Sequence, residues 1–398
     1  MVYKRRLGDI IRLSSGGTPS KKKDDYWNGD IPWISAKNMK EDLLEDSSIY
    51  ITKDGLNHGS KLAPRGSVLL LVRGSGLFKD IPICYVERDL AFNQDVKCIE
   101  SIDPENIPNK YIFYWLKSQK YTLSKSVGVT TIGAGKFDTD YILNMEIQIP
   151  AIEVIKKQVD FLDSITQKIK CNKQINDNLA EQAQAVLYRF MDQYQYQLNP
   201  LSEIADVIDC LHSKKPTAVD DSSYQLIQLD NIRDDGFLDM SACKYMISQT
   251  DYENWTRKCE IIEGDCVITN VGRIGAVSQA PAGTKAAMGR NMTCIRLKSN
   301  HELHAYFITE LLSNHMRRQI KQNTDEGTIM GALNVKNIPK LLFPIFASSI
   351  MSDLENILYP VRKQIEYNNL QNQSLSQLRD ALLPKLMSGE LDVSNLVL

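Results

Sequence analysis

The stretch Ala91-Phe-Asn-Gln-Asp-Val-Lys-Cys-Ile99 has a counterpart 196 residues further along the chain, Ala287-Met-Gly-Arg-Asn-Met-Thr-Cys-Ile295. Leu179, in a polar helix-forming stretch, recurs as Leu375 at the same offset, and two such copies almost fill the 398 residues. Self-similarity at one fixed offset indicates an internal repeat. The sequence therefore predicts a duplicated unit, a globular part followed by a long helix, and a pseudo-twofold relation between the copies.

The repeat divides the chain into four segments of alternating character. The offset drifts in the globular parts, from 194 between Leu7 and Leu201 to 198 between Gly66 and Gly264, but stays at 196 in the helical parts. We infer that the globular copies diverged while the helices kept their register. The predicted boundaries are 1–150 and 200–345 for the globular domains, and 151–199 and 346–398 for the helical segments.

Each globular part contains short β-like runs broken by glycine and proline, followed by a helix-like stretch. The matching runs are 67–72 with 265–269, 96–99 with 293–296, and, for the helices, 110–118 with 303–321. This mixture predicts an α+β fold, with two mixed α/β domains of the same design.

The helical segments show a seven-residue spacing of apolar residues, which is typical of helices that pair along their length. The two sets are Ile165, Asn172, Leu179 and Val186, and Leu354, Val361, Asn368, Leu375 and Leu382. About 40 residues at roughly 1.5 Å each give a rod on the order of 60 Å long. We predict a coiled coil; two unrelated surface helices are the alternative.

Two features inside these segments leave alternatives open. Asn172 and Asn368 occupy matching positions, as do Asn176 and Asn372. A buried asparagine in a helix seam fixes register and partner at some cost in stability, whereas the same residues are unremarkable if they face solvent. Pro360 either kinks the second helix or marks a later start.

Composition restricts the class of protein. Hydrophobic residues make up 43% and charged residues 24%, the net charge is −2, and no run of 18 apolar residues occurs. We therefore expect a soluble protein without a membrane span. Eight cysteines without a C-x-x-C pair favour a reducing cytoplasm and argue against disulfides and zinc. The pair His301 and His304 lacks neighbouring cysteine or acidic ligands, so no metal is expected.

Catalytic motifs are missing. A DNA adenine methyltransferase needs an Asn/Asp-Pro-Pro-aromatic segment for its flipped base, and no Pro-Pro pair occurs. The segment Gly128-Val-Thr-Thr-Ile-Gly-Ala-Gly-Lys136 has the wrong spacing for a phosphate-binding loop, and Phe137 follows where serine or threonine is required. We predict a protein that is not an enzyme and has no cofactor.

Several phrases resemble those of one family, the specificity subunits of type I restriction–modification systems. The resemblance covers essentially the whole chain and includes the repeat itself. Its motifs are Leu7-Gly-Asp-Ile10, Ser15-Gly-Gly-Thr-Pro19, Tyr26-Trp27, Gly29-Asp-Ile-Pro-Trp-Ile34, Thr130-Thr-Ile132, Ile147-Gln-Ile-Pro150, Gly327-Thr-Ile329, Pro344 and the tail Leu378-Arg-Asp-Ala-Leu-Leu-Pro-Lys-Leu-Met-Ser-Gly-Glu-Leu391.

The resemblance implies a non-catalytic subunit. Its two target-recognition domains would each read one half of a split target in double-stranded DNA. Two helices in an antiparallel coiled coil would hold the domains apart and set the spacer. Two methyltransferase (modification) subunits would dock on it, and motor-nuclease (restriction) subunits would join. The second domain departs from the pattern, with Leu211-His-Ser-Lys-Lys-Pro216 where the first has Gly-Gly-Thr-Pro, so loop residues do not transfer simply between the domains.

Candidate DNA contacts follow from residue chemistry. Lysine suits phosphate contact, which positions a protein without specifying sequence. Asparagine offers a bidentate pattern to adenine, and arginine offers one to guanine. The candidates are Lys21, Lys22, Lys23, Lys37, Asn38, Arg73 and Ser75 in the first domain, and Asn231, Arg233, Asn270, Arg273, Arg290 and Asn291 in the second.

Two competing interpretations remain. A coiled-coil scaffold would assemble proteins without reading DNA sequence, and a self-sufficient modification enzyme would transfer methyl groups alone. The scaffold predicts no sequence-specific DNA complex, and the enzyme predicts methyl transfer by the isolated chain.

Overall fold

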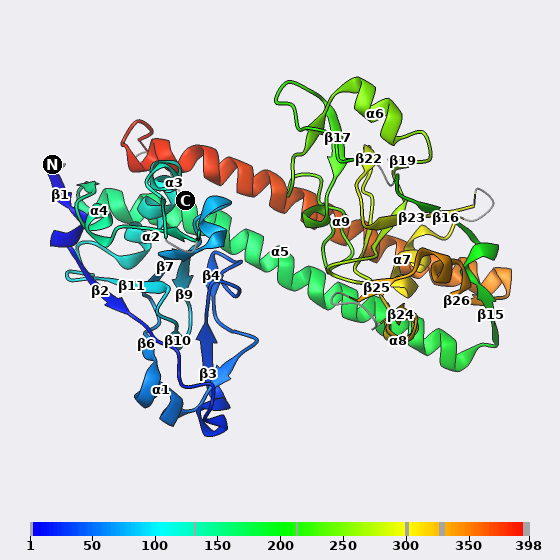
Figure 1. The fold of residues 1–398 in the computed structure, drawn as a ribbon, viewed down its shortest axis with the longest axis horizontal. Helices are drawn as coiled ribbons and strands as arrows, with labels where there is room; N and C mark the ends of the chain where they lie inside the picture. The colour runs from blue at the N-terminus through cyan, green and yellow to red at the C-terminus, as the bar shows by residue number, and fades with distance from the viewer. Residues whose placement is uncertain (1–2, 131–132, 212–213, 299–301, 326–330, 393–398) are drawn as a thin grey trace. The chain divides into compact units, whose positions relative to one another are not determined.

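The computed structural model describes residues 3–130, 133–211, 214–298, 302–325 and 331–392. The chain divides into two compact units, residues 1–167 with 375–398 and residues 168–374. Two long helices, α5 (Ile152–Gln193) and α9 (Ser348–Met387), each contribute to both units (Figure 1).

The first unit is built on two sheets. The strand order of the first sheet is β2 (Ile11–Ser15), β11 (Val96–Ser101), β7 (Val68–Leu71), β9 (Ile83–Val86), β4 (Leu43–Leu44). The strand order of the second sheet is β5 (Tyr50–Ile51), β3 (Trp27–Ile34), β10 (Leu90–Phe92), β6 (Lys61–Ala63). Most neighbours are antiparallel, but β10 runs parallel to β3 and β4 parallel to β9. Helix α1 (Lys53–Gly59) connects β5 to β6.

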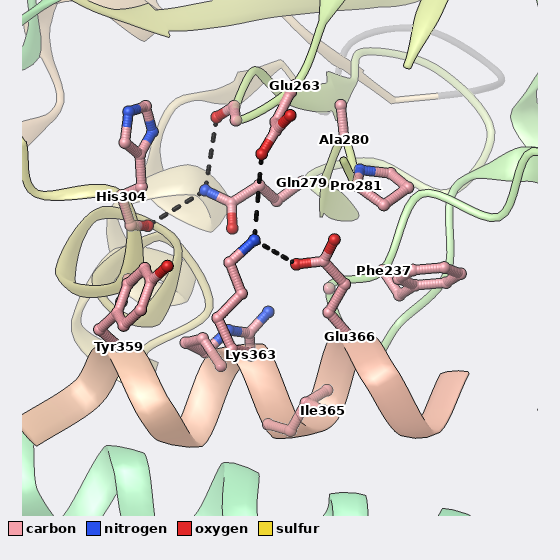
Figure 2. Close-up of a pocket in the computed structure, with 14 residues that line it drawn as sticks. Phe237, Glu263, Gln279, Ala280, Pro281, His304, Tyr359, Lys363, Ile365 and Glu366 are labelled. Atoms are coloured by element: carbon pink, nitrogen blue, oxygen red, sulfur yellow. Dashed lines mark hydrogen bonds and ion pairs between the residues drawn. The ribbon is translucent and has the colours of Figure 1, made fainter. Parts of the chain in front are cut away.

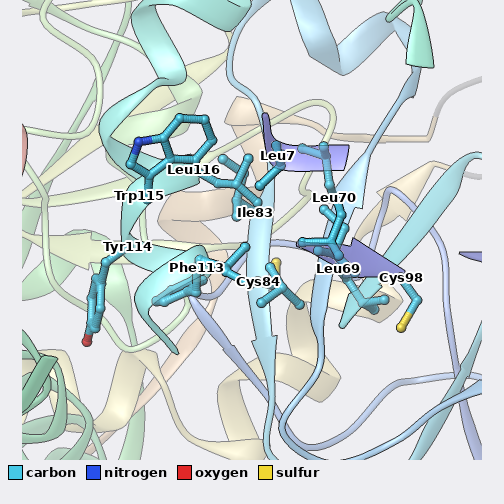
Figure 3. Close-up of a cluster of buried hydrophobic side chains, with 14 of the residues drawn as sticks. Leu7, Leu69, Leu70, Ile83, Cys84, Cys98, Phe113, Tyr114, Trp115 and Leu116 are labelled. Atoms are coloured by element: carbon cyan, nitrogen blue, oxygen red, sulfur yellow. The ribbon is translucent and has the colours of Figure 1, made fainter. Parts of the chain in front are cut away.

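The core of this unit lies between the first sheet and helix α2 (Asn109–Ser118). Figure 3 shows Phe113 and Leu116 of α2 beside Leu69 of β7 and Ile83 of β9. All four side chains are buried, as are all four residues of β7 and residues 111–117 of α2, so both elements are covered on more than one side. The short helix α3 (Lys120–Lys125) follows α2.

Smaller elements complete the first unit. A ribbon joins β8 (Arg73–Gly74), β13 (Gly135–Lys136) and β12 (Gly128–Val129). Strand β1 (Tyr3–Arg6) pairs with β14 (Glu146–Ile149). Strand β14 follows the short helix α4 (Thr139–Leu143) in the chain.

The second unit repeats this plan. The strand order of its first sheet is β16 (Ala205–Asp209), β23 (Met292–Leu297), β20 (Cys266–Thr269), β21 (Val277–Gln279). The strand order of its second sheet is β18 (Met246–Ile247), β17 (Tyr224–Ile227), β22 (Lys285–Met288), β19 (Glu260–Ile262). Further matching elements are β15 (Tyr196–Pro200) paired with β26 (Leu342–Phe346), β24 (Thr324–Asp325) paired with β25 (Ala332–Leu333), α6 (Gln249–Trp255), α7 (His304–Leu311), α8 (Asn314–Gln322) and the 3-10 helix η6 (Val335–Lys340). The predicted α+β fold is confirmed; the second unit repeats the order of the main strands but has no counterpart of β4.

The long helices pair in antiparallel fashion within each unit. In the first unit Gln158 of α5 donates a hydrogen bond to the carbonyl oxygen of Leu386 in α9, at 2.8 Å. In the second unit Asn172 lies against Asn372, and Leu187 shares a core with Leu354. As the residue number increases along α5, the number of its contact partner in α9 decreases. The two helices therefore run antiparallel, and the predicted pairing is confirmed. Helix α9 begins at Ser348 and continues past Pro360, so the proline does not mark the start of the helix.

The asparagines of the seam are buried and bonded to one another. Asn172 Nδ2 donates to Asn372 Oδ1 at 2.9 Å, and Asn368 Nδ2 donates to Asn176 Oδ1 at 2.8 Å. Adding the repeat offset of 196 to Asn172 gives Asn368, and subtracting it from Asn372 gives Asn176, so the layer has the symmetry of the repeat. The expectation of buried, register-fixing asparagines is confirmed as to burial, and the solvent-facing alternative is wrong.

We expect Asn172→Ala to destabilise the protein by about 1–3 kcal/mol, because it leaves the buried amide of Asn372 without its partner. Replacing Asn172 and Asn372 together by leucine should cost much less, since both polar groups leave at once. Urea unfolding of the two variants checks this. Equal losses of stability in both would show that the asparagine pair has no coupling.

A buried ion-pair network ties the end of α9 to the first unit. Asp42 contacts the ammonium of Lys117 and accepts a hydrogen bond from Arg379 at 2.6 Å. Lys117 and Arg379 keep only 5% and 9% side-chain exposure. Burial raises the pKa of Asp42, but the charges of Lys117 and Arg379 outweigh this, and the pKa lies below its ordinary value.

This network predicts a pH dependence of stability. A carboxyl group with a lowered pKa in the folded state stabilises that state above its unfolded pKa, about 4, and this stabilisation is lost as pH falls through the folded pKa. Asp42→Asn should lower the free energy of unfolding at pH 7 by roughly 3 kcal/mol, because two buried cations lose their counter-charge. Its stability should also fall less than that of wild type between pH 5 and 2, as measured by thermal unfolding. Parallel pH curves would contradict the assignment.

Candidate nucleic-acid interface

Three loops meet at one end of the sheets in each unit. In the first unit β3 and β10 run parallel and end together, and the Asn93 amide donates to the carbonyl oxygen of Ile34 at 3.0 Å. The backbone amide of Val72, just after β7, donates to the backbone carbonyl oxygen of Asp95 at 2.8 Å. We call residues 35–42, 72–78 and 93–95 the first tip.

The second unit has the same arrangement. Strands β17 and β22 run parallel and end together, and the Asn270 amide donates to the carbonyl oxygen of Asn291 at 2.8 Å. We call residues 228–235, 270–276 and 289–291 the second tip. Loops at strand ends are the usual place for binding residues on a rigid scaffold.

At the first tip, Lys37, Arg73 and Ser75 are exposed, as DNA contact requires. Arg73 lies in β8 opposite Lys136 of β13, so two cations share the ribbon. Gly74, which follows Arg73 and pairs with Gly135, has φ +144°, a conformation that side chains disfavour. Lys136 was not among the sequence-based candidates, and only this strand pairing reveals it.

The lysines 21–23 lie elsewhere in the first unit. All three are exposed, and they precede the start of β3, whereas the first tip follows its end. Eight strand residues span roughly 20–25 Å. The ammonium of Lys23 lies 3.1 Å from the Tyr26 hydroxyl and 5.0 Å from its ring centre. A phosphate contact by this cluster stays a prediction, separate from the first tip.

Asn38 and Asn231 are turn-forming residues in equivalent positions. Asn231 Oδ1 accepts the Gln228 amide at 2.8 Å, and Asn38 Oδ1 accepts the Ser35 amide at 3.3 Å. Asn231 is fully buried, and its Nδ2 donates to the carbonyl oxygen of Asp239 at 2.7 Å. Both ends of the Asn231 amide are thus engaged in the turn, so a base contact by Asn231 stays a prediction and would require this cap to open. Asn38 uses its acceptor in the same cap.

Asn270 is also a structural residue. It is 6% exposed, and its Nδ2 donates to the Thr293 hydroxyl at 2.9 Å. Its carbonyl oxygen accepts the Leu333 amide at 2.9 Å, which ties β20 to β25. A contact of Asn270 with adenine stays a prediction, which its burial and its bond to Thr293 disfavour.

Arg233 and Arg273 lie at the second tip but are held by acidic neighbours. Arg233 donates to Asp235 at 2.5 Å. Arg273 contacts Asp234 and donates to the carbonyl oxygen of Ile232 at 2.6 Å. Arg273 stays 44% exposed, so it can reach a ligand only at the expense of the ion pair.

Arg290 and Asn291 are the best-placed candidates at the second tip. Both are exposed in the tight turn between β22 and β23. Asn291 has φ +66°, an uncommon conformation for which asparagine is better suited than most residues. The turn presents both side chains away from the sheet core.

Sequence reasoning missed a cationic groove beside the second tip. Arg317 and Lys321 of α8 line a cavity of about 640 Å³ together with Arg273, its ion-pair partner Asp234 and residues 274–277. Helix α8 buries Met316 and Ile320 and exposes Arg317, Arg318 and Lys321. This helical spacing of cations opposite apolar residues was the available signal.

A second cavity, of about 390 Å³, lies between α9 and the sheets of the second unit (Figure 2). Lys363 reaches Glu366 at 2.9 Å and Glu263 at 4.0 Å. Gln279 donates to the carbonyl oxygen of His304 at 3.1 Å. These groups satisfy one another and offer no nucleophile beside a base, so we assign the cavity to the packing of α9.

One group of described residues has the geometry of a metal site, namely Cys259, Asp265 and Cys294. Arg296 already occupies it, donating to both Asp265 oxygens at 2.7 and 2.6 Å. A guanidinium in that position repels a cation, so we assign no metal chemistry here.

Of the sequence features singled out above, Thr131, Ile132, His301 and residues 327–329 lie outside the described residues, as do 212–213. Gly128 and Lys136 face each other in a β-ribbon, which is not the strand–loop–helix of a phosphate-binding loop.

Comparison with known proteins shows similarity to one family. The model of the type I restriction modification DNA specificity domain matches residues 2–181. A specificity subunit of the type I restriction enzyme EcoR124I/EcoR124II from Escherichia coli is 32% identical over 195 residues, 47% of this chain and 48% of that protein. The MjaIX specificity subunit of Methanocaldococcus jannaschii is 23% identical over 98% of this chain and 94% of its own.

The chain is similar to the type I restriction–modification specificity subunits, and the specificity-domain match lies in residues 2–181.

The fold is similar to that of a solved S subunit. The crystal structure of the type I restriction–modification S subunit from M. genitalium has a TM-score of 0.50 at 15% identity, over 97% of this chain and 96% of that one. That likeness concerns the fold alone. The stronger sequence match spans about half of the E. coli specificity subunit, whereas the match to the M. jannaschii specificity subunit spans nearly all of it. Among the described residues, no helix is both long and apolar enough to cross a membrane.

Proposed function

We propose that this protein is a specificity subunit, the non-catalytic DNA-recognition component of a type I restriction–modification complex. Each domain tip reads one half of a bipartite target in double-stranded DNA, and the paired helices determine the distance between the halves. In this proposal residues 1–150 and 200–345 are the reading domains, and 151–199 and 346–398 are the spacer segments. The subunit itself needs no cofactor.

The observation that carries the proposal is the duplicated tip. Two domains of one design present the same three loops, and the exposed residues on those loops differ. Arg73 and Ser75 stand at the first tip, and Arg290 and Asn291 at the second. Identical scaffolds with different surface residues suit two different half-sites, because base edges are read by side chains and not by the fold.

The partners follow from the same proposal. Two methyltransferase subunits dock on the paired helices, and motor-nuclease subunits join them for restriction. Along the helices of the second unit, Ile175, Tyr367 and Leu370 are 39%, 59% and 39% exposed. Tyr367 and Leu370 are neighbours on one face of α9, three residues apart. Apolar side chains left in water on a long helix are the kind of surface that a protein partner covers.

Gel-shift assays test this function against the scaffold alternative. The chain together with its methyltransferase partner should retard one duplex sequence much more strongly than scrambled duplexes of equal length. The isolated chain should transfer no methyl group. Equal retardation of all duplexes would favour a scaffold, and methyl transfer by the chain alone would favour an enzyme.

A further inference from the structure

Helix α8 carries three exposed cations with no acidic partner among the described residues. Arg317, Arg318 and Lys321 are all exposed, and no ion pair involves them. The only side-chain hydrogen bond among them is a weak one, from Arg318 to the carbonyl oxygen of Asn314 at 3.2 Å. On the opposite face Met316 and Ile320 are buried, so the orientation of α8 is fixed by packing.

The position of α8 makes it an extension of the second tip. Gly275 of the tip has φ +75°, and a Cβ added to it would lie 2.6 Å from Ile320 of α8. The two segments therefore touch. Arg317 and Lys321 line the cavity shared with Arg273, and they also line a neighbouring open cavity of about 510 Å³ with Arg318, Asn314 and Tyr188.

We infer that α8 is a phosphate clamp that binds the DNA backbone beside the half-site read by the second tip. This inference rests on the proposed DNA-recognition function and names the group that supplies affinity without sequence preference. Cations on a rigid helix neutralise phosphates and release condensed counterions. A chain with net charge −2 needs such local clusters, because its overall field does not attract DNA.

The equivalent helix of the first unit is different. In α3, Lys120 pairs with Asp80 at 2.9 Å, and Lys125 lies 4.0 Å from the ring centre of Tyr121. Its cations are fewer than those of α8, and one is already neutralised. The clamp is therefore a property of the second domain, and the two half-sites should depend unequally on salt.

The test is the salt dependence of duplex binding by the chain with its methyltransferase partner. For the triple variant Arg317→Ala, Arg318→Ala, Lys321→Ala, the slope of log K against log salt should fall in magnitude by about 2 to 3, near 0.9 per phosphate. Binding near 0.15 M salt should weaken on the order of 10- to 100-fold. The methylated motif should stay unchanged, because phosphate contacts carry no base information.

Two controls separate the clamp from folding and from general charge. Arg317→Lys with Arg318→Lys keeps the charge and should keep the slope. Lys340→Ala removes an exposed lysine next to Leu341, which bonds Leu201 near the start of β16, at the opposite end of the sheet from the tip. It should leave the slope unchanged.

The outcomes distinguish the clamp from the function on which it rests. If the triple variant keeps the wild-type slope, or if its methylated motif changes, the clamp is wrong while DNA recognition stands. A triple variant that loses RNA or anionic-vesicle binding but keeps duplex binding also overturns the clamp. If the wild-type complex prefers no duplex sequence, the proposed function itself fails.

Discussion

Inserting one heptad into each long helix is expected to lengthen the unread spacer of the DNA target by up to about three base pairs. Seven helical residues add roughly 10 Å, and one base-pair step rises about 3.4 Å. The insertions belong between Lys168 and Ile169 in α5 and between Leu375 and Ser376 in α9. The two insertion points face each other if the antiparallel register that pairs Asn172 with Asn372 continues along the helices.

Both helices must receive the insertion, because the pairing is register-specific. Gln158 meets Leu386 and Asn172 meets Asn372, so a heptad in α5 alone would force one of these contacts out of alignment. The single insertion is the matched control and should reduce stability and methylation together. The spacer is measured by sequencing methylated sites in cells. An unchanged spacer in the double insertion would show that the helices do not set the distance.

Arg73→Ala and Arg290→Ala are expected to relax different halves of the target. Each arginine is exposed at its own tip, and one bidentate contact to guanine contributes about 1–3 kcal/mol of discrimination, roughly 10- to 100-fold. The altered motif should therefore accept additional bases at one or two positions in one half only. Sequencing of methylated sites, variant against wild type, gives the result directly.

Asn231→Ala provides the control for these substitutions. Because Asn231 caps a buried turn, its loss should reduce stability and leave the motif unchanged in the fraction that folds. The assignment of Arg73 and Arg290 would be contradicted if neither substitution changed the motif, or if both changed the same half.

Much of the fold was predictable because the repeat compares the chain with itself. The constant offset along the helices reflects one shared constraint, the buried seam that holds Asn172 and Asn368 in register. The drift in the globular parts reflects loops of different length on the same strands. The tie of Arg379 to Asp42 was not predictable, since the two residues are 337 positions apart and neither lies on an apolar repeat.

The candidate site was predictable only in part. Residue chemistry selected Arg73 and Arg290, which the structure places exposed at the tips, and it also selected Asn231, which recurs in the repeat because it caps a turn. An asparagine that bonds its own backbone and one that meets a base look the same in sequence. Helix α8 was missed because three cations in nine residues are also typical of a solvated helix face. Only its contact with Gly275 places it at the tip.

The central claim is that two unlike domains read two halves of one interrupted target. It is tested most directly by sequencing the methylated sites of cells that carry this chain with its methyltransferase partner. The account predicts an interrupted motif of two different halves, present with the chain and absent without it. A continuous motif, or one that persists when the chain is deleted, would contradict it.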